Sequence, residues 1–161
     1  IVDGLSAAGS VQLANTTGSS STAFGLTYAG IDGLSVSYGQ GNSEGVTGAH
    51  GDQTIMKGSY VYGSFTLSVS NNDHEDSVAA DNQETSSYAV SYSVTDELSF
   101  SYGEETIERA TYATDIEVSG ISASYTSGGM TLGVTQISAD NVGHLEARDN
   151  DTWQIGLSFA F

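Results

Sequence analysis

The chain has 161 residues, of which 20 are Asp or Glu and three are Lys or Arg, so its formal net charge is −17. This charge argues against nucleic-acid binding, because contacts with phosphate require basic side chains. The absence of Cys excludes disulfides and thiol chemistry, and no apolar run of about 18 residues exists that could form a transmembrane helix. The length predicts one domain, residues 1–161.

Apolar residues recur at every second position, which is the period of a β-strand rather than of a helix. In chain order the pattern predicts about ten strands, at 5–13, 24–29, 34–39, 55–62, 65–70, 87–94, 98–103, 116–125, 130–135 and 152–161. In the eighth strand Ile116 and Val118 are out of step with the rest, and we expect a bulge at Gly120 to correct this. Ile55 and Val61 place apolar groups on the otherwise polar face of their strand, without an evident reason.

The connections between these strands alternate in length. The short turns, at 29–33, 62–64, 94–97 and 126–129, are rich in the Gly, Asp and Ser that tight turns require. The longer polar segments are 15–22, 41–51, 71–85, 104–114 and 138–150. This alternation is typical of an antiparallel up-and-down β-barrel in a bacterial outer membrane, with short periplasmic turns and longer external loops. We therefore predict an all-β transmembrane barrel in that membrane.

One parity of each predicted strand carries large apolar side chains, and the sequence contains no second layer to cover them. Successive side chains of a strand point to opposite faces, so these residues form one apolar face, and lipid is its expected cover. The residues predicted to face lipid are Leu67, Val90, Leu132, Val134, Trp153, Ile155, Leu157 and Phe159.

Aromatic residues gather near the short turns. They are Tyr28, Tyr62, Phe65, Tyr92, Tyr125 and Phe161. Because such rings favour the membrane–water interface, and because they cluster at one end only, we predict that they form a periplasmic aromatic girdle. The alternative is ordinary aromatic packing on a soluble sheet.

The opposite parity consists mainly of Ser, Gly, Thr and Ala, with Lys57 as nearly its only charge. Small barrels fill their interior with side chains, so a lining of small polar groups that leaves room for water favours a channel wall. The predicted pore-facing residues include Lys57, Ser91, Ser93 and Gln154. The alternative is a narrow ten-stranded barrel held together by hydroxyl hydrogen bonds.

No arrangement of nucleophile, base and orienting group is evident, and we expect neither enzymatic activity nor a cofactor. The weak candidates for a loop-bound Ca²⁺ or Mg²⁺ are Asp73, His74, Glu75 and Asp76, although a solvated acidic loop is the better interpretation of such a run. Twelve acids fall in three predicted loops. Acids around a pore mouth would favour cations, and they could also bridge to lipopolysaccharide phosphates through divalent cations.

Three stretches carry a resemblance to a known family: the terminal QIGLSFAF of residues 154–161 and the two hairpins at 26–38 and 88–102. The chain resembles the Gram-negative porins, most closely those of alphaproteobacteria. The resemblance implies a homotrimer of sixteen-stranded barrels that passes small hydrophilic solutes, with the terminal Phe161 as an assembly signal. Because about ten strands are too few for that family, it also implies that this chain is the C-terminal part of a larger porin, without the constriction loop.

The leading hypothesis is therefore a passive diffusion channel that prefers cations. A self-contained small barrel, acting as an anchor or as a barrel enzyme, is one alternative, since even strand numbers from eight upward occur. Predicted strands of about 9–11 residues count against the enzyme, because they would only span the membrane. A secreted β-rich adhesin or fibre is another alternative, although the chain lacks the fixed repeat expected of one.

Overall fold

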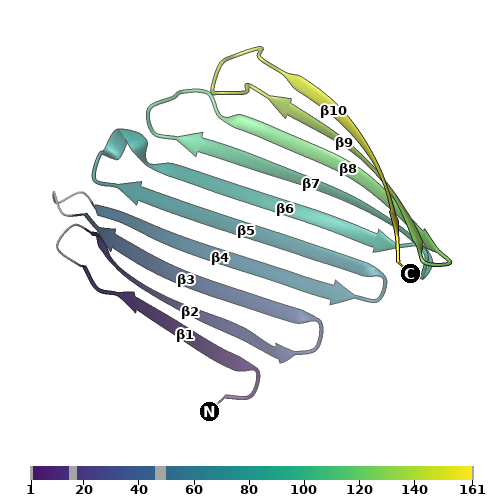
Figure 1. Cartoon of the computed structure of the whole chain (residues 1–161), viewed down its shortest axis with the longest axis horizontal. Helices are drawn as coiled ribbons and strands as arrows, with labels where there is room; N and C mark the ends of the chain where they lie inside the picture. Colours follow the sequence, from purple (N-terminus) through teal and green to yellow (C-terminus); the bar gives the residue numbers. More distant parts are fainter. Residues whose placement is uncertain (1, 15–17, 46–49, 161) are drawn as a thin grey trace.

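The computed structural model describes residues 2–14, 18–45 and 50–160. They form one antiparallel ten-stranded sheet in which every strand lies beside its neighbours in the chain (Figure 1). The strands are β1 (Leu5–Gln12), β2 (Ser20–Ile31), β3 (Leu34–Glu44), β4 (His50–Tyr62), β5 (Phe65–Asp76), β6 (Gln83–Ser93), β7 (Leu98–Arg109), β8 (Ile116–Ser127), β9 (Met130–Asp140) and β10 (Asn150–Phe159). The prediction of an all-β, up-and-down fold with about ten strands is confirmed.

The sheet is curved and open. Its edge strands, β1 and β10, lie at opposite sides of the view in Figure 1, and the strand order does not pair them with each other within the described residues. One short 3-10 helix, η1 (Ala79–Asp81), lies between β5 and β6. No helix of the described residues is long and apolar enough to cross a membrane.

The expected bulge at Gly120 is wrong. Strand β8 pairs residue by residue with both neighbours, and Gly120 lies opposite Gly103 and Ile137 without a register shift. The apolar Ile116 and Val118 therefore lie on the face opposite to that of Ile121. A register shift occurs instead in the first hairpin, between Tyr28 and Ile31. It keeps both of these side chains on the same face, since Tyr28 pairs with Val36 and Ile31 with Leu34.

Eight of the ten described strands are longer, and the long connections shorter, than the sequence predicts; β1 and β10 are the exceptions. Strands extend into every segment expected to be a loop, and the longest, β4, has 13 residues. In the segment 71–85, for example, β5 continues to Asp76 and β6 begins at Gln83. Polarity alone misled the prediction, because backbone pairing in a sheet does not require apolar side chains. The argument that the strands only span a membrane is therefore wrong.

The two faces of the sheet differ in chemistry and in exposure. Residues paired directly across strands share a face, so the register assigns each side chain to one face. On β5 the apolar Phe65, Leu67 and Val69 are 49%, 53% and 59% exposed, whereas Thr66 and Ser68 between them are only partly exposed. We call the face of Leu67 the apolar face and the face of Ser68 the small-residue face.

This arrangement is the reverse of a soluble sheet, in which the apolar side is the covered one. No side chain of the described residues is buried, so the sheet has no core of its own. Exposed apolar surface of this extent marks a region that contacts a partner or a membrane. The apolar face must therefore be covered by something other than the described residues.

Candidate pore wall

The small-residue face brings together all four of the predicted pore-facing residues. We call a row of residues paired across successive strands a rung. Ser91 on β6 lies opposite Ser101 of β7, and their rung continues through Ser122 and Thr135 to Gln154. Lys57 and Ser93 occupy other rungs of this face. That the face lines water stays a prediction, but the shared placement is the one a channel wall requires.

Hydroxyl groups on this face pair across neighbouring strands. The hydrogen-bonded oxygens belong to Thr27 and Ser37 at 3.0 Å, Ser70 and Ser87 at 2.8 Å, Ser101 and Ser122 at 2.6 Å, and Thr126 and Thr131 at 2.9 Å. In each pair one hydroxyl donates and the other accepts, which leaves further lone pairs free for water. The four pairs link neighbouring strands through short side chains, which project little above the face.

Glycines on neighbouring strands explain why two apolar side chains, Ile55 and Ile137, lie on this face. A Cβ added at Gly39 would come within 2.9 Å of the Ile55 side chain, so Ile55 lies over the backbone of that glycine. Ile137 similarly lies beside Gly120, where an added Cβ would be 3.8 Å away. Each isoleucine occupies space that is free because the glycine on the neighbouring strand has no side chain. The sequence of one strand does not show which residue lies beside it on the next, so this arrangement could not be predicted.

The face carries more charge than the sequence suggested. Besides Lys57 it presents Glu105, which shares the rung of Ser87, and, nearer the long connections, Asp76 and Arg109. Sequence reasoning missed Glu105 because the segment from residue 104 onward was expected to be a loop rather than the continuation of β7.

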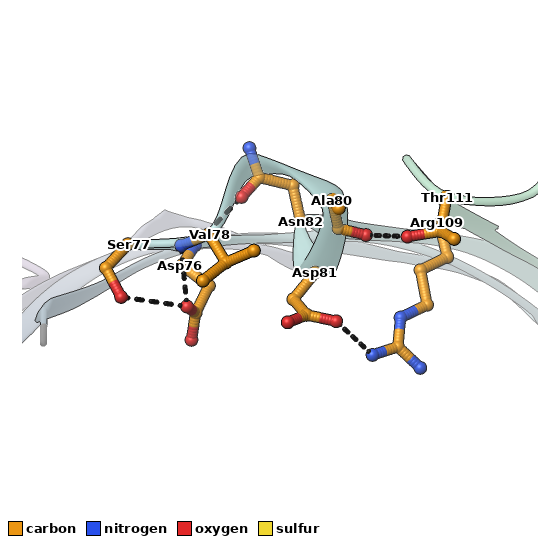
Figure 2. A network of polar contacts seen from close by, with 8 residues as sticks. All are labelled: Asp76, Ser77, Val78, Ala80, Asp81, Asn82, Arg109 and Thr111. Atoms are coloured by element: carbon orange, nitrogen blue, oxygen red, sulfur yellow. Dashed lines mark hydrogen bonds and ion pairs between the residues drawn. The ribbon is translucent and has the colours of Figure 1, made fainter.

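The charges nearest the β5–β6 connection are tied into a local network (Figure 2). Arg109 of β7 forms a 2.8 Å ion pair with Asp81 of η1. The carboxylate of Asp76 accepts hydrogen bonds from the Val78 N–H at 2.9 Å and from the Ser77 hydroxyl at 3.1 Å. Asp76 lies beyond the apolar part of its strand, and these bonds, that from Val78 first, lower the pKa of its carboxyl. The connection is thus fixed to the ends of β5 and β7.

The apolar face contains all eight residues predicted to face lipid. Leu67 pairs with Val90, Leu132 with Leu157, and Val134 with Ile155. The remaining two, Trp153 and Phe159, have the parity of Leu157 on β10 and are 71% and 61% exposed.

The apolar residues form a belt that crosses the rungs of the sheet diagonally. On β2 the last apolar residue towards the long connections is Phe24, whose rung reaches β4 at Thr54, whereas on β10 it is Trp153, whose rung reaches β4 at Tyr60. Across the sheet the belt thus shifts by six residues over eight strand-to-strand steps, or about 0.75 residues per strand. With a rise of about 3.4 Å per residue and a strand spacing of about 4.8 Å, this shift corresponds to an average slope of about 28° between the belt and the rungs.

The belt has aromatic residues along both of its margins. On the turn side, Tyr62, Phe65 and Tyr92 share one rung, and the rings of Phe65 and Tyr92 stack at 4.5 Å. Tyr28 and Tyr125 lie on the same face, and Phe161 lies outside the described residues.

Sequence reasoning missed the second margin, and the view that the aromatics cluster at one end only is wrong. The aromatic residues on the side of the long connections are Phe24, Tyr38, Tyr88, Tyr102 and Trp153. Each is the last apolar residue of its parity before polar residues begin, as with Gln40 after Tyr38. This change from apolar to polar residues is visible in the sequence, but it can be interpreted only when the strand is known to continue beyond it.

Half of the 20 acids lie on the outer side of the sheet rather than on the small-residue face. Ten of them lie on strand ends beyond the belt, with the parity of the apolar face: Glu44, Asp52, Asp73, Glu75, Glu84, Glu104, Glu108, Glu117, Asp140 and Asp151. Strand alternation is the reason, because it directs every second side chain of an extended segment to the outer side.

The run proposed as a weak metal site is divided by the same alternation. Asp73 and Glu75 lie on the apolar face of β5, whereas His74 and Asp76 lie on the small-residue face. The four side chains therefore do not converge. Within residues 2–14, 18–45 and 50–160, no group of three or more His, Asp or Glu side chains is arranged to hold a metal ion.

Solved structures with a similar fold are outer-membrane proteins. OmpT of Vibrio cholerae superposes with a TM-score of 0.71 at 15% identity, over 99% of this chain and 62% of that chain. The fold is that of a bacterial outer-membrane β-barrel. The NanC porin gives 0.62 at 11% identity over 98% of this chain and 93% of its own, and the KdgM porin, solved with disordered oligogalacturonate, gives 0.55 at 13% identity over 100% and 86%.

The chain spans about three fifths of the length of OmpT. A scan against protein-family models and a search of curated proteins give no match. At these identities the likeness shows the fold alone. It agrees with the predicted outer-membrane barrel, and it shows neither the alphaproteobacterial type nor the position of this chain within a larger protein.

Proposed function

We propose that this chain forms the wall of a water-filled outer-membrane channel for passive diffusion of ions and small hydrophilic solutes. The observation that carries the proposal is the reversed sheet: large apolar side chains are exposed on one face and short hydroxyl side chains are half-covered on the other. A membrane barrel has this character, with lipid outside and water inside.

The slope of the belt supports a membrane rather than a protein as the cover. Strands of outer-membrane barrels are tilted by about 35–45°, so a belt parallel to the membrane must cross the rungs at that angle. The belt does cross the rungs obliquely, with an average slope of about 28° between Phe24 and Trp153, which is smaller than that range. The two aromatic margins then lie where the two membrane–water interfaces would be.

We further propose that the channel prefers cations. The formal charge is −17, and the field of carboxylates around an opening in a low-dielectric membrane attracts counter-ions. Because ten acids lie on the outer side of the strand ends, this preference acts at long range and should be sensitive to salt. The same acids are suited to lipopolysaccharide phosphates bridged by divalent cations.

The proposed assembly follows the porin resemblance. The chain would be the C-terminal part of a larger alphaproteobacterial-type porin that assembles as a homotrimer, and its coverage of 62% of OmpT supports a larger whole. In this account the protein has no catalytic activity, nucleic-acid partner or cofactor. A barrel enzyme is the second candidate, since strands of up to 13 residues extend past the belt and carry acids and histidines there.

Conductance of the full protein in planar bilayers tests the proposal. Stepwise channels should appear, and Ser101→Trp on the small-residue face of β7 should lower the single-channel conductance. Tyr102→Trp, the next residue on the apolar face, should leave it unchanged. A protein that inserts but does not conduct, and that hydrolyses peptide or ester substrates, would support the barrel enzyme instead.

A further inference from the structure

Two charges of opposite sign lie on one rung of the small-residue face. Lys57 of β4 pairs with Ser70, Ser70 pairs with Ser87, and Ser87 pairs with Glu105 of β7. Both charged side chains are exposed, and neither takes part in an ion pair among the described residues. Two serines, hydrogen-bonded to each other at 2.8 Å, are all that separate them on the rung.

The distance between the backbones of Lys57 and Glu105 is larger than the diameter of a single ion. Three strand-to-strand steps of about 4.8 Å separate the two backbones, or about 14 Å in all. Flexible side chains at both ends let the charged groups approach each other or move apart. An extended peptide of three residues is about 10 Å long, because each residue spans at most about 3.6 Å. Its terminal charges therefore match the available separation.

The surface between the two charges is hollowed rather than flat. One shallow hollow contains Lys57, Ser59, Ser68 and Ser70, and a second contains Glu105 and the paired glycines Gly103 and Gly120. The two hollows meet at Ser87 and Ala89 of β6. Together their linings extend from β3 to β9, and the rung from Lys57 to Glu105 crosses both.

The floor of these two hollows suits a chain of peptide groups. Serine hydroxyls donate and accept hydrogen bonds, so they can pair with both the N–H and the C=O of a bound backbone. The glycines keep the floor low. At Gly103 an added Cβ would lie only 3.2 Å from the Tyr88 carbonyl oxygen and 3.3 Å from the Ala89 Cβ.

We propose that Lys57 and Glu105 are the two ends of a subsite for dipolar solutes, which binds a carboxylate at Lys57 and an ammonium group at Glu105. Zwitterionic peptides of about three residues are the solute class that fits. The inference rests on the proposed channel function, because it requires the small-residue face to line water. It predicts brief retention during passage rather than tight binding, since exposed ion pairs are weak.

The experiment measures open-channel noise of the full protein in planar bilayers with triglycine, N-acetyl-triglycine and triglycine amide at neutral pH. Triglycine carries both charges, whereas each of the other two carries only one. We expect the residence time of triglycine to exceed that of each analogue by about two- to fivefold, which is the range of one exposed ion pair. If triglycine amide binds as well as triglycine, Glu105 is a simple cation site and the proposal is wrong.

Variants of the two charged residues separate a dipolar site from a general charge effect. Lys57→Gln and Glu105→Gln should each remove the advantage of triglycine. The double exchange Lys57→Glu with Glu105→Lys should restore it, because the solute can bind in the reverse direction. Glu108→Gln, on the apolar face of the same strand as Glu105, is the matched control and should leave the advantage of triglycine unchanged.

The outcomes also separate this inference from the channel function itself. A conducting channel whose residence times are the same for all three peptides would overturn the dipolar subsite and leave the channel function intact. A protein that inserts without conducting would overturn the channel function. Loss of the triglycine advantage in the double exchange would show that the sign at each position, rather than the separated pair, controls retention.

Discussion

Replacing Leu67 by Arg tests which face of the sheet contacts lipid. Leu67 lies at the middle of the apolar belt of β5, between Tyr60 and Val90, with 53% of its surface exposed. An arginine at the lipid-facing midplane of an outer-membrane barrel costs about 2–4 kcal/mol. The equilibrium constant for unfolding should therefore rise about 30- to 700-fold, at about 1.4 kcal/mol per factor of ten.

Ser68→Arg is the matched control, because it places the same charge one residue further along the same strand. Its side chain would project from the small-residue face into water, so we expect a loss below about 1 kcal/mol. Urea titration of the protein in lipid vesicles would measure both, with the single tryptophan, Trp153, as the fluorescence probe. Equal losses for the two variants, or a larger loss for Ser68→Arg, would refute the assignment of the faces.

Three further predictions concern ion selectivity, turn geometry and acid stability. Reversal potentials under a salt gradient should show cation preference at about 0.1 M salt. The preference should fade at about 1 M, because the Debye length falls from about 10 Å to about 3 Å. A preference for anions at low salt would contradict the role of the acids. Gly33→Ala should cost about 1–3 kcal/mol more unfolding free energy than Gly63→Ala. Both glycines have positive φ, of 73° and 58°, but only at Gly33 would the new Cβ meet a backbone oxygen, that of Val61; equal urea midpoints would refute this. The lowered pKa of Asp76 means that its bonds to Val78 and Ser77 stabilise the folded connection above the unfolded pKa of about 3.9 and lose this contribution as pH falls through the folded pKa. The hydrogen-exchange protection factor of the Val78 amide, which corrects for the intrinsic pH dependence of exchange, should fall there, and Asp76→Asn should abolish the change.

The sequence was sufficient to predict the number of strands and the face of most side chains in their apolar parts. Period-two alternation is a local property, and the side chain of Leu157 or Ser91 is assigned to a face by its neighbours along the strand alone. Short turns could also be located, because positive-φ glycines such as Gly33 and Gly63 are concentrated there. These features need no information from distant parts of the chain.

The sequence was insufficient wherever the partner strand decides the outcome. The polar ends of β5 and β7 were expected to be loops, although pairing with their neighbours keeps them extended as far as Asp76 and Arg109. Once these strands are known to continue, the alternation of their side chains places Glu105 on the small-residue face and shows the second aromatic margin. The position of Ile137 on the small-residue face could not be explained from its own strand. Its side chain lies there beside Gly120 of β8, which leaves room for it.

The central claim is that one face of the sheet contacts lipid and the other contacts water, and cysteine scanning of β6 tests it most directly. The protein has no native Cys, so each variant carries one thiol. In vesicles, a membrane-impermeant thiol reagent should label cysteines at positions 87, 89, 91 and 93 and spare those at 88, 90 and 92, in strict alternation. Uniform labelling along the strand, or labelling of positions 88, 90 and 92 in place of their neighbours, would contradict the account.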